Sequence, residues 1–319
     1  MDLRAALDEA MDLAVVPSFT KVGYDVRRRL YGWGQPVQRP LDGRRVVLTG
    51  ATSGLGLAAA RTLARAGAEL ALVARDRAKG RRVLADLGER AELVIGDLGD
   101  LDAVRAMGER LAAGGRVDVL VHNAGALLDR RRRSPQGHEL TFASMVLGPH
   151  LLTRLLVPAM ERAPDAPGGP ARVIWVASGG MYLQRLRLDD LMMEREPYRG
   201  TIAYARAKRA QVLLAQAWAE RLAERGVVVH ATHPGWADTP GVAASLPNFR
   251  RILGPLLRSP EQGADTIVWL ASADEPARTT GLFWHDRRPR PIDRLPWTRA
   301  SAAEREELWR RCEVLVGDG

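Results

Sequence analysis

The chain of 319 residues contains 46% hydrophobic and only 5% aromatic residues, which suits one folded α/β domain with extensions and excludes a disordered chain. Its formal net charge of +9 comes almost entirely from arginine, since Lys21, Lys79 and Lys208 are the only lysines. The arginines alternate with acidic residues and no nucleic-acid-reading module accompanies them, so we expect no nucleic acid as a partner. The single cysteine, Cys312, excludes an intramolecular disulfide and a cysteine-rich metal site, and no metal ion is expected.

The first forty residues lie outside the pattern of the rest of the chain. A helix is expected over 2–13, and Gly23 and Tyr24 follow before the segment ends at Pro40. The segment lacks the features of a signal peptide, and no later apolar stretch of membrane-spanning length is expected, which with the single cysteine predicts a cytoplasmic protein. We interpret residues 1–41 as a packed extension. Contact with a membrane surface is the weaker alternative, because the polar face of this arm carries acids as well as basic residues.

Short apolar runs alternate with longer segments of helical period, rich in Ala, Leu and Arg, from Arg44 onward. Continuous apolar strands separated by helices are typical of a parallel sheet that is covered on both faces. The sequence therefore predicts an α/β fold with a doubly wound, Rossmann-type sheet in one catalytic domain over 42–290, followed by a C-terminal extension over 291–319. The expected strands are 45–49, 70–74, 93–95, 117–121, 173–177 and 227–233.

The first of these strands runs directly into a glycine-rich turn and then into an alanine-rich helix. Gly50 permits the sharp turn, Gly54 lets the backbone approach a pyrophosphate, and Gly56 allows the helix to pack closely on the strand. The free N–H groups and the positive dipole at the start of that helix favour phosphate. The turn between a strand and a helix indicates a dinucleotide site. Its expected residues are Thr49, Gly50, Thr52, Ser53, Gly54, Leu55 and Gly56.

The end of the second strand sets the choice of cofactor, since the adenosine ribose of a dinucleotide lies there. Arg75 comes first after the apolar run, and its guanidinium offers a forked, charged donor to a 2′-phosphate. The sequence thus favours NADP(H). Asp76 keeps NAD(H) as the alternative, because a carboxylate accepts hydrogen bonds from a free 2′-hydroxyl.

Tyr204 and Lys208 lie early in a helical segment, four residues apart and hence on one face. A neutral phenol with a pKa of about 10 is a poor base near neutrality, and a nearby ammonium group favours its ionised form. Lys208 is also a candidate to hydrogen-bond the nicotinamide ribose. The pair alone is common in helices, but with the glycine turn upstream it indicates catalysis.

The glycine turn followed by the helix of Tyr204 and Lys208 resembles the short-chain dehydrogenase/reductase family, over about residues 42–285. The resemblance implies that Ser178 hydrogen-bonds the substrate oxygen beside Tyr204. It also implies that residues following three further strands line the cofactor, namely Asp97, Leu98, Asn123, Ala124, Gly125, Pro234, Gly235 and Thr239. Longer strings resemble the branch of the family that contains dehydrogenase/reductase member 12, and these strings are 178–181, 233–241 and 262–266.

Two positions depart from the family pattern. His122 stands where the family usually has a first asparagine before Asn123, and we expect His122 to pack at the end of its strand. Met145 stands where the family generally has an asparagine that orders a water relay to the catalytic lysine. Because a thioether cannot donate that hydrogen bond, we expect slower proton transfer or another path.

The expected activity is hydride transfer between NADP(H) and a small-molecule carbonyl or alcohol. Tyr204 is the expected proton donor, Ser178 orients the oxygen, and Lys208 tunes the phenol. Apolar segments over 181–193 and 242–257 fit the walls of a lipophilic pocket. Ordinary core packing is the alternative interpretation of these two segments.

A catalytically weak NADP(H)-binding sensor or interaction protein is the rival function. Met145 favours this rival, whereas the presence of Ser178, Tyr204 and Lys208 argues against it. The family resemblance also implies a homo-oligomer that assembles through the helices of Met145 and Tyr204.

Overall fold

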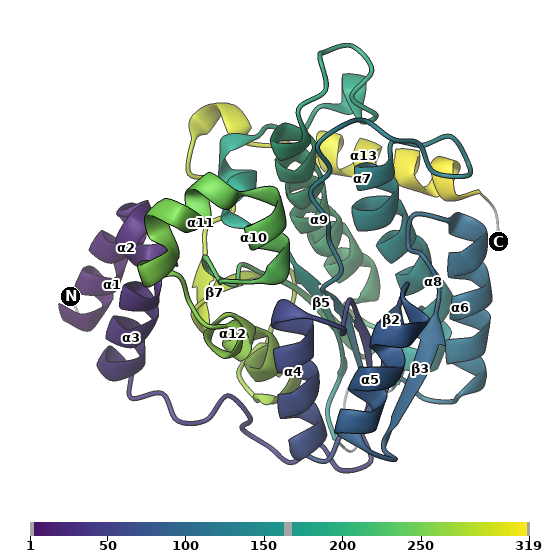
Figure 1. The fold of residues 1–319 in the computed structure, drawn as a ribbon, viewed down its shortest axis with the longest axis horizontal. Coiled ribbons are helices and arrows are strands. Elements are labelled where there is room, and N and C mark those ends of the chain that lie inside the picture. Colours follow the sequence, from purple (N-terminus) through teal and green to yellow (C-terminus); the bar gives the residue numbers. More distant parts are fainter. Residues whose placement is uncertain (1–2, 163–167, 318–319) are drawn as a thin grey trace.

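One sheet with helices on both of its faces forms the body of the protein (Figure 1). The computed structural model describes residues 3–162 and 168–317. Within them, eight strands follow the order β3-β2-β1-β4-β5-β6-β7-β8, and only the β7–β8 pair is antiparallel. This is the doubly wound, Rossmann-type α/β sheet that the sequence predicts. The strands are β1 (Arg45–Thr49), β2 (Glu69–Ala74), β3 (Ala91–Ile95), β4 (Val119–His122), β5 (Ala171–Val176), β6 (Val227–Thr232), β7 (Phe283–His285) and β8 (Arg288–Arg290).

The six strands expected from apolar runs are β1 to β6, whereas the short hairpin of β7 and β8 is not predicted. Each of these two strands has three residues. Asp286 and Arg287 join them with φ values of 52° and 53°, in the left-handed region. Two-residue hairpin turns of this kind usually contain Asn or Gly, so the Asp-Arg pair gives no turn signal in the sequence.

Helices cover each face of the sheet with a separate apolar layer. The helices of this part are α4 (Gly54–Arg65), α5 (Arg77–Leu87), α6 (Leu101–Ala113), α7 (Leu140–Phe142), α8 (Gly148–Met160), α9 (Gly200–Leu222), α10 (Pro240–Ser245), α11 (Pro247–Leu253) and α12 (Pro260–Ser272). Strand β5 shows the alternation, since Ile174 and Val176 join the layer of α4, α5 and α12, while Val173 and Trp175 join the layer of α6, α8 and α9. The sheet is therefore buried on both sides, as its continuous apolar strands require.

The N-terminal arm consists of α1 (Leu3–Leu13), α2 (Val15–Phe19) and α3 (Lys21–Leu30). Helix α1 matches the expected helix over 2–13, apart from Asp2, which lies outside the described residues. Polar contacts fix the arm on α12 and on the β7–β8 turn: Tyr24 donates to Asp265 at 3.1 Å, and Arg27 pairs with Asp286 at 2.7 Å. Figure 1 shows the arm as a compact group of helices at one end of the sheet.

The C-terminal helix α13 (Ala302–Val316) lies across α8 and α9 (Figure 1). The Trp309 ring packs edge to face on Trp218, with the centroids 4.6 Å apart. Glu313 hydrogen-bonds His150 at 2.5 Å. Cys312 is fully buried, and burial raises the pKa of its thiol. Because α13 covers α8 and α9, copies of the chain that assembled on this side would meet through α13.

Among the described residues, one helical run is long and apolar enough to cross a membrane, contrary to the expectation from the sequence. It spans Leu140–Met160, which comprises α7, a π-helical turn (Ala143–Leu147) and α8. Of its most apolar window, 78% is buried inside the protein. Packing against the sheet accounts for this hydrophobicity, because a helix that is apolar all round is typical of a protein core.

Candidate cofactor and active site

The turn after β1 has the shape of a phosphate cradle. Gly50 and Gly54 have φ values of 70° and 53°, in the left-handed region that glycine favours. A Cβ at Gly56 would lie 2.2 Å from the carbonyl oxygen of Gly50, so α4 begins directly against the turn. Ser53 precedes α4 without a side-chain capping bond, which leaves the first N–H groups of the helix without a side-chain acceptor. The pyrophosphate of a dinucleotide fits this arrangement.

Thr49 and Asn123 join the ends of β1 and β4 beneath the turn. The Thr49 Oγ1 accepts backbone N–H bonds from Asn123 at 3.0 Å and from Ala124 at 3.1 Å. The Asn123 side-chain amide donates to the carbonyl oxygens of Thr49 at 3.1 Å and Gly50 at 3.2 Å. Both polar side chains are engaged in holding the turn, so their part in a cofactor site is to position it.

Several of the other residues expected at the cofactor site serve packing. Leu55 contacts α12, since a Cβ at Gly263 would lie 2.4 Å from its Cδ2. Leu98 is 5% exposed and belongs to the core. Thr52 is half-buried and Ser53 exposed on the turn itself. Thr52 and Ser53 thus lie on the surface of the glycine turn, whereas Leu55 and Leu98 support it from the interior.

The end of β2 presents an arginine and a carboxylate with different partners. The Arg75 side chain is 68% exposed and lies 3.6 Å from the Asp97 carboxylate. Asp76 caps α5, accepting the N–H of Lys79 at 3.0 Å, and this backbone hydrogen bond is the main reason that the pKa of Asp76 is lowered. Asp97 accepts the N–H of Gly99 at 2.8 Å. The carboxylate nearest the expected ribose is therefore occupied by a helix cap, and the guanidinium faces solvent.

Ser178, Tyr204 and Lys208 come together at the carboxyl end of β5. Ser178 follows the strand and begins a 3-10 turn (Gly179–Leu183), while the other two lie on α9. The Ser178 side chain lies close enough to Tyr204 to lower the pKa of the phenol. The Lys208 Nζ donates to the Val176 carbonyl oxygen at 2.6 Å and lies 5.5 Å from the centre of the Tyr204 ring. The structure thus brings together the three side chains that the sequence singles out.

Burial shifts the pKa values of both titratable groups in this trio. Burial raises the pKa of Tyr204 to about 12, and the Ser178 side chain opposes that rise. Burial lowers the pKa of Lys208 to about 7. The phenol is therefore protonated near neutral pH, and the ammonium titrates there. A Cβ at Gly125 would lie 3.6 Å from the Lys208 Nζ, so the predicted loop after β4 borders the same space.

The loop after β6 closes toward the glycine turn. A Cβ at Gly54 would lie 3.1 Å from the Thr239 Cβ, which places the two loops in contact. Gly235 has a φ of 75°, and a Cβ there would lie 2.3 Å from the Arg258 Nε. The carbonyl oxygen of Pro234 accepts a hydrogen bond from Arg258 at 3.4 Å. Thr239 thus lies against the glycine turn, while Pro234 and Gly235 contact the Arg258 side chain.

Comparison with known proteins agrees with this arrangement. The family model of the short chain dehydrogenases matches residues 44–248. The chain is 37% identical over 295 residues to dehydrogenase/reductase SDR family member 12 of Bos taurus, covering 91% of this chain and 90% of that protein. This chain belongs to the short-chain dehydrogenase/reductase family. The predicted likeness to the branch of member 12 is confirmed, and the chain is an oxidoreductase of this family.

Other members of the family differ in the substrate and cofactor that their names give. Polyprenol dehydrogenase of Mus musculus is 36% identical over 305 residues, covering 92% of this chain and 90% of that protein. A crystal structure of 3-ketoacyl-(acyl-carrier-protein) reductase from Brucella melitensis in complex with NADH has a TM-score of 0.62 and 28% identity, covering 76% of this chain and 96% of that chain. A crystal structure described as an NAD(P) dependent gluconate 5-dehydrogenase from Beutenbergia cavernae, with bound NADP, has a TM-score of 0.61 and 30% identity, covering 78% of this chain and 96% of that chain. Members of the family therefore bind either nicotinamide cofactor.

His122 and Met145, the two departures from the family pattern, both lie in the core. The His122 Nε2 lies 2.7 Å from the Thr153 Oγ1, and burial lowers the pKa of the ring to about 3. Met145 is fully buried, and a Cβ at Gly125 would lie 3.8 Å from its methyl carbon. The backbone carbonyl of Met145, within the π-helical turn, accepts a hydrogen bond from the Gln211 side chain at 2.6 Å. Gln211 is a contributor to this part of the site that carries no signal in the sequence.

The N-terminal arm, which lies outside the matched family region, contacts residues next to the site. The carbonyl oxygen of Phe19 accepts the N–H of Trp236 at 2.7 Å. The Phe19 ring packs edge to face on His233, with centroids 4.3 Å apart. The His233 Nδ1 in turn accepts the N–H of Gly179, next to Ser178, at 3.1 Å. The arm thus contacts both the loop after β6 and the turn that carries the serine.

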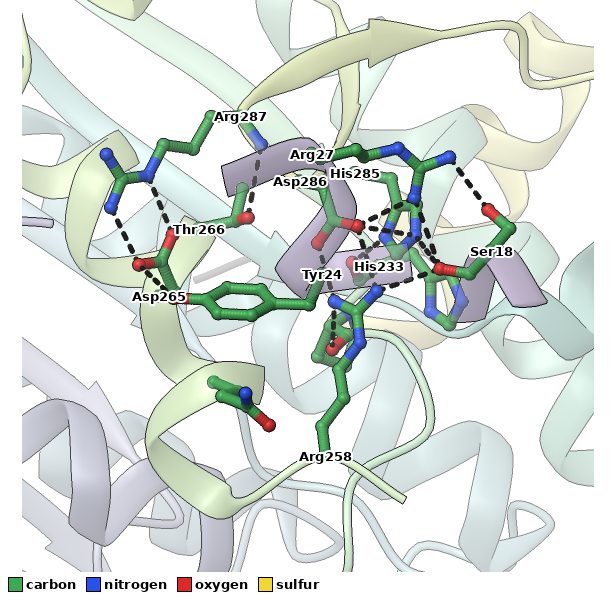
Figure 2. Close-up of polar contacts among 12 residues, drawn as sticks. Ser18, Tyr24, Arg27, His233, Arg258, Asp265, Thr266, His285, Asp286 and Arg287 are labelled. Carbon is green, nitrogen blue, oxygen red and sulfur yellow. Dashed lines mark hydrogen bonds and ion pairs between the residues drawn. The ribbon is translucent and has the colours of Figure 1, made fainter. Parts of the chain in front are cut away.

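A buried charge network ties the arm to the same loop (Figure 2). Asp286 lies between Arg27 at 2.7 Å and Arg258 at 2.5 Å, and all three side chains are at most 1% exposed. Arg258 also donates to the carbonyl oxygens of Ser18 at 2.9 Å and Thr20 at 3.2 Å. Although burial alone would raise it, the neighbouring cations hold the pKa of Asp286 far below its usual value. Sequence reasoning misses this network, because Arg27 and Asp286 are 259 residues apart.

The apolar segments expected to wall a pocket divide between core and cleft. Met181 and Tyr182 are buried in the core, whereas Leu183 is 69% exposed. Helices α10 and α11 contain no fully buried residue. Ser245 on α10 donates to the carbonyl oxygen of Leu127 at 3.4 Å, which joins this segment to the loop after β4. Packing in the core accounts for the first part of 181–193, while α10 contacts the loop after β4.

Proposed function

We propose that the chain is an NADP(H)-dependent oxidoreductase acting on a lipophilic small-molecule carbonyl or alcohol. The observation that supports this most directly is the convergence of Ser178, Tyr204 and Lys208 at the end of β5, with the Lys208 Nζ 5.5 Å from the centre of the phenol ring. A proton donor, an orienting hydroxyl and a nearby cation are the groups that carbonyl reduction needs at the substrate oxygen.

In reduction, bound NADPH supplies the hydride, and the side chains of this protein handle the oxygen. Because the pKa of Tyr204 is raised to about 12, the phenol keeps its proton near neutrality and donates it to the carbonyl oxygen. Ser178 holds that oxygen beside the phenol. In alcohol oxidation the phenol must first lose its proton, and the Lys208 ammonium stabilises the phenolate. A general acid of this kind contributes about a hundredfold to ten-thousandfold in rate.

The preference for NADP(H) over NAD(H) rests on the end of β2. Asp76 is engaged as the cap of α5, whereas the Arg75 guanidinium is 68% exposed. A 2′-phosphate offers this guanidinium a charge-assisted, forked hydrogen bond, which a free hydroxyl does not.

The preference for a lipophilic substrate rests on apolar residues that follow the loop after β6. Val242 on α10, Leu246 between the two helices and Phe249 on α11 are half-buried. Pockets lined by such residues select apolar ligands. The names of two relatives point the same way, polyprenol dehydrogenase and retinol dehydrogenase 12 of Mus musculus, the latter 29% identical over 316 residues, with 95% of this chain and 97% of that protein covered.

The proposal includes a cytoplasmic location and a homo-oligomer with α13 in its interface. The rival function is an NADP(H)-binding sensor with weak catalysis. Met145 favours this rival. Its thioether lies near Lys208 at Gly125 and provides no carbonyl or hydroxyl oxygen that could accept a hydrogen bond from the ammonium group.

A substrate screen that follows NADPH absorbance tests the proposal. The panel contains polyisoprenoid aldehydes, long-chain ketones and, for contrast, charged sugars, each with NADPH and with NADH. We expect consumption of NADPH with the apolar carbonyls. Replacing Tyr204 by Phe removes the proton donor and keeps the ring, so Tyr204→Phe should lower turnover by about a hundredfold or more and leave the Kd for NADPH unchanged.

Tyr31→Phe is the matched control, because Tyr31 is hydrogen-bonded to Asp8 in the arm and lies outside the trio. Turnover of this variant should equal that of the unmodified protein. Unchanged turnover in Tyr204→Phe would refute the catalytic assignment. Tight NADPH binding without consumption by any carbonyl would favour the sensor.

A further inference from the structure

Helix α1 faces its carboxylates inward and its leucines outward. Leu3 and Leu7 are 82% and 50% exposed, while Asp8 and Asp12 are 2% and 7% exposed. Each pair is four residues apart, so each lies along one side of the helix. A surface helix of a globular protein normally has the opposite orientation, with its apolar side against the core.

Ion pairs fix α1 in this orientation. Asp8 pairs with Arg27 and with Arg290, both at 2.7 Å. Asp12 pairs with Arg294 at 2.6 Å. Rotating the helix would break these buried pairs, which costs several kcal/mol for each unpaired charge. The acids of the arm argue against a membrane from the sequence alone, but Asp8 and Asp12 face inward, which leaves Glu9 as the exposed acid of α1.

The arm and the segment 247–256 carry further exposed apolar side chains, and together with the leucines of α1 we call them the apolar rim. The two segments are linked through Trp236, since Phe19 of α2 packs on Trp236 and Trp236 packs on Phe249 of α11, with ring centroids 5.6 and 5.1 Å apart. The members of the apolar rim are between 38% and 82% exposed, and they are Leu3, Leu7, Leu13, Val15, Val16, Val22, Ile252 and Leu256.

The charges around the apolar rim are mainly positive. Over the described residues 3–30 and 240–257, Glu9 is the only exposed acidic residue. The exposed basic residues in the same segments are Arg4, Lys21, Arg28, Arg29, Arg250 and Arg251, of which Arg250 pairs with the nearby Asp238 at 2.7 Å. Basic residues beside exposed apolar side chains are typical of segments that lie on anionic membrane surfaces.

We propose that the apolar rim docks this protein on the surface of an anionic lipid bilayer. The leucines and valines enter the interface between headgroups and acyl chains, and the arginines and Lys21 contact the phosphates. A second copy of the chain fits less well, because a two-fold interface through this face would place the same cations opposite one another. One consequence rests on the proposed function. Helices α10 and α11, which follow the loop after β6, would face the lipid that holds an apolar substrate.

Vesicle flotation of the full chain tests this surface without any turnover measurement. The vesicles are pure phosphatidylcholine or phosphatidylcholine mixed with phosphatidylglycerol. We expect flotation with the mixed vesicles, weakened by salt because the cations are at the surface. Leu7→Glu should lower the affinity by about tenfold or more, since one buried leucine is lost from the interface. Arg251→Glu should weaken binding to the mixed vesicles alone.

Val314→Asp and Arg81→Glu are the matched controls. Val314 is 69% exposed on α13, and Arg81 is exposed on α5, both outside the apolar rim. Both controls should float like the unmodified protein, and NADPH binding should be equal in all variants. Failure of the unmodified chain to float, or equal flotation of Leu7→Glu, would overturn the proposal. A dimer in sedimentation velocity that Leu7→Glu dissociates would instead assign this face to a second copy.

Discussion

At the scale of single residues, cofactor choice depends on Arg75. Its exposed guanidinium stands at the end of β2, and its neighbour Asp76 is engaged as a helix cap. We expect Arg75→Ala to lower kcat/KM for NADPH by about tenfold to a hundredfold, the value of one or two charge-assisted hydrogen bonds. The value for NADH should not change. Arg81→Ala, further along α5, is the control, and equal losses for both cofactors in Arg75→Ala would contradict the assignment.

A second prediction at this scale concerns Met145, whose side chain lies near the Lys208 ammonium group at Gly125. The thioether shares the space at Gly125 with the Lys208 ammonium, and an asparagine there would add a hydrogen-bond donor and acceptor. We therefore expect Met145→Asn to raise turnover several-fold with an accepted substrate. Steady-state kinetics at saturating NADPH measures this effect.

Met145→Leu is the control for that substitution, because it keeps the site apolar and similar in volume. Its turnover should match that of the unmodified protein. If Met145→Asn is folded, binds NADPH and turns over no faster, then Met145 does not impair the proton transfer.

The sequence identifies the residues whose chemistry lies in a short string, and it is silent on roles that arise from distant strands. The glycine turn and the pair of Tyr204 and Lys208 are of the first kind. The Thr49 hydroxyl, by contrast, supports the loop of Asn123, 74 residues away. Such a role depends on which strands become neighbours, and that order is a property of the folded sheet.

At the scale of elements, the arm acts as a clamp on the loop after β6. Asp286 receives both Arg27 from α3 and Arg258 from the segment after α11. Asp286→Asn removes the buried carboxylate that pairs with Arg258 and one of the carboxylates that pair with Arg27, which keeps Asp8. We expect a loss of about 3–5 kcal/mol in the free energy of unfolding, measured by urea denaturation. The KM for NADPH should also rise, because Arg258 holds the Pro234 carbonyl.

Asp86→Asn is the matched control for this substitution. Asp86 pairs with Arg61 at 2.8 Å, and both side chains are about half exposed, at 47% and 51%. Such a pair contributes at most about 1 kcal/mol. Equal stability of the Asp286 and Asp86 variants would show that the clamp is not important for folding.

Periodicity predicts elements well where burial is continuous and poorly where polar contacts decide. The strands β1 to β6 are apolar runs, and helix α1 matches its expected position. The β7–β8 hairpin depends on the clamp around Asp286 rather than on a turn sequence. The outward direction of Leu3 and Leu7 depends on arginines that are more than 280 residues further on, at Arg290 and Arg294.

At the scale of the whole molecule, several arginine side chains are buried and bind groups in the interior. Arg27, Arg209 and Arg258 are among the largest fully buried side chains. Arg209 donates to the carbonyl oxygens of Ile292 at 2.7 Å and Thr298 at 2.6 Å, which attaches the C-terminal segment to α9. The net charge of +9 is therefore not a single binding patch, and part of it stabilises the contacts between the two extensions and the sheet.

The histidines make the stability of the whole fold dependent on pH. The chain has six histidines, and burial lowers the pKa of every one, namely His122, His138, His150, His230, His233 and His285. Below about pH 6.5 the unfolded chain therefore binds more protons at these residues than the folded chain does. The free energy of unfolding thus falls as the pH falls.

This acid sensitivity should appear before the buried carboxylates of the arm and the clamp titrate. The pKa values of Asp8 and Asp286 are lowered from 3.8, so the stability that they contribute is lost only below about pH 4. Between about pH 6.5 and pH 4, we expect stability to fall by up to about 1.4 kcal/mol per pH unit for each buried histidine. Urea denaturation at a series of pH values measures this slope.

His122→Asn should reduce the slope by one proton, because the pKa of His122 is lowered to about 3 and asparagine does not titrate. A slope that is flat over this range, or unchanged in His122→Asn, would mean that the buried rings are protonated in the folded protein.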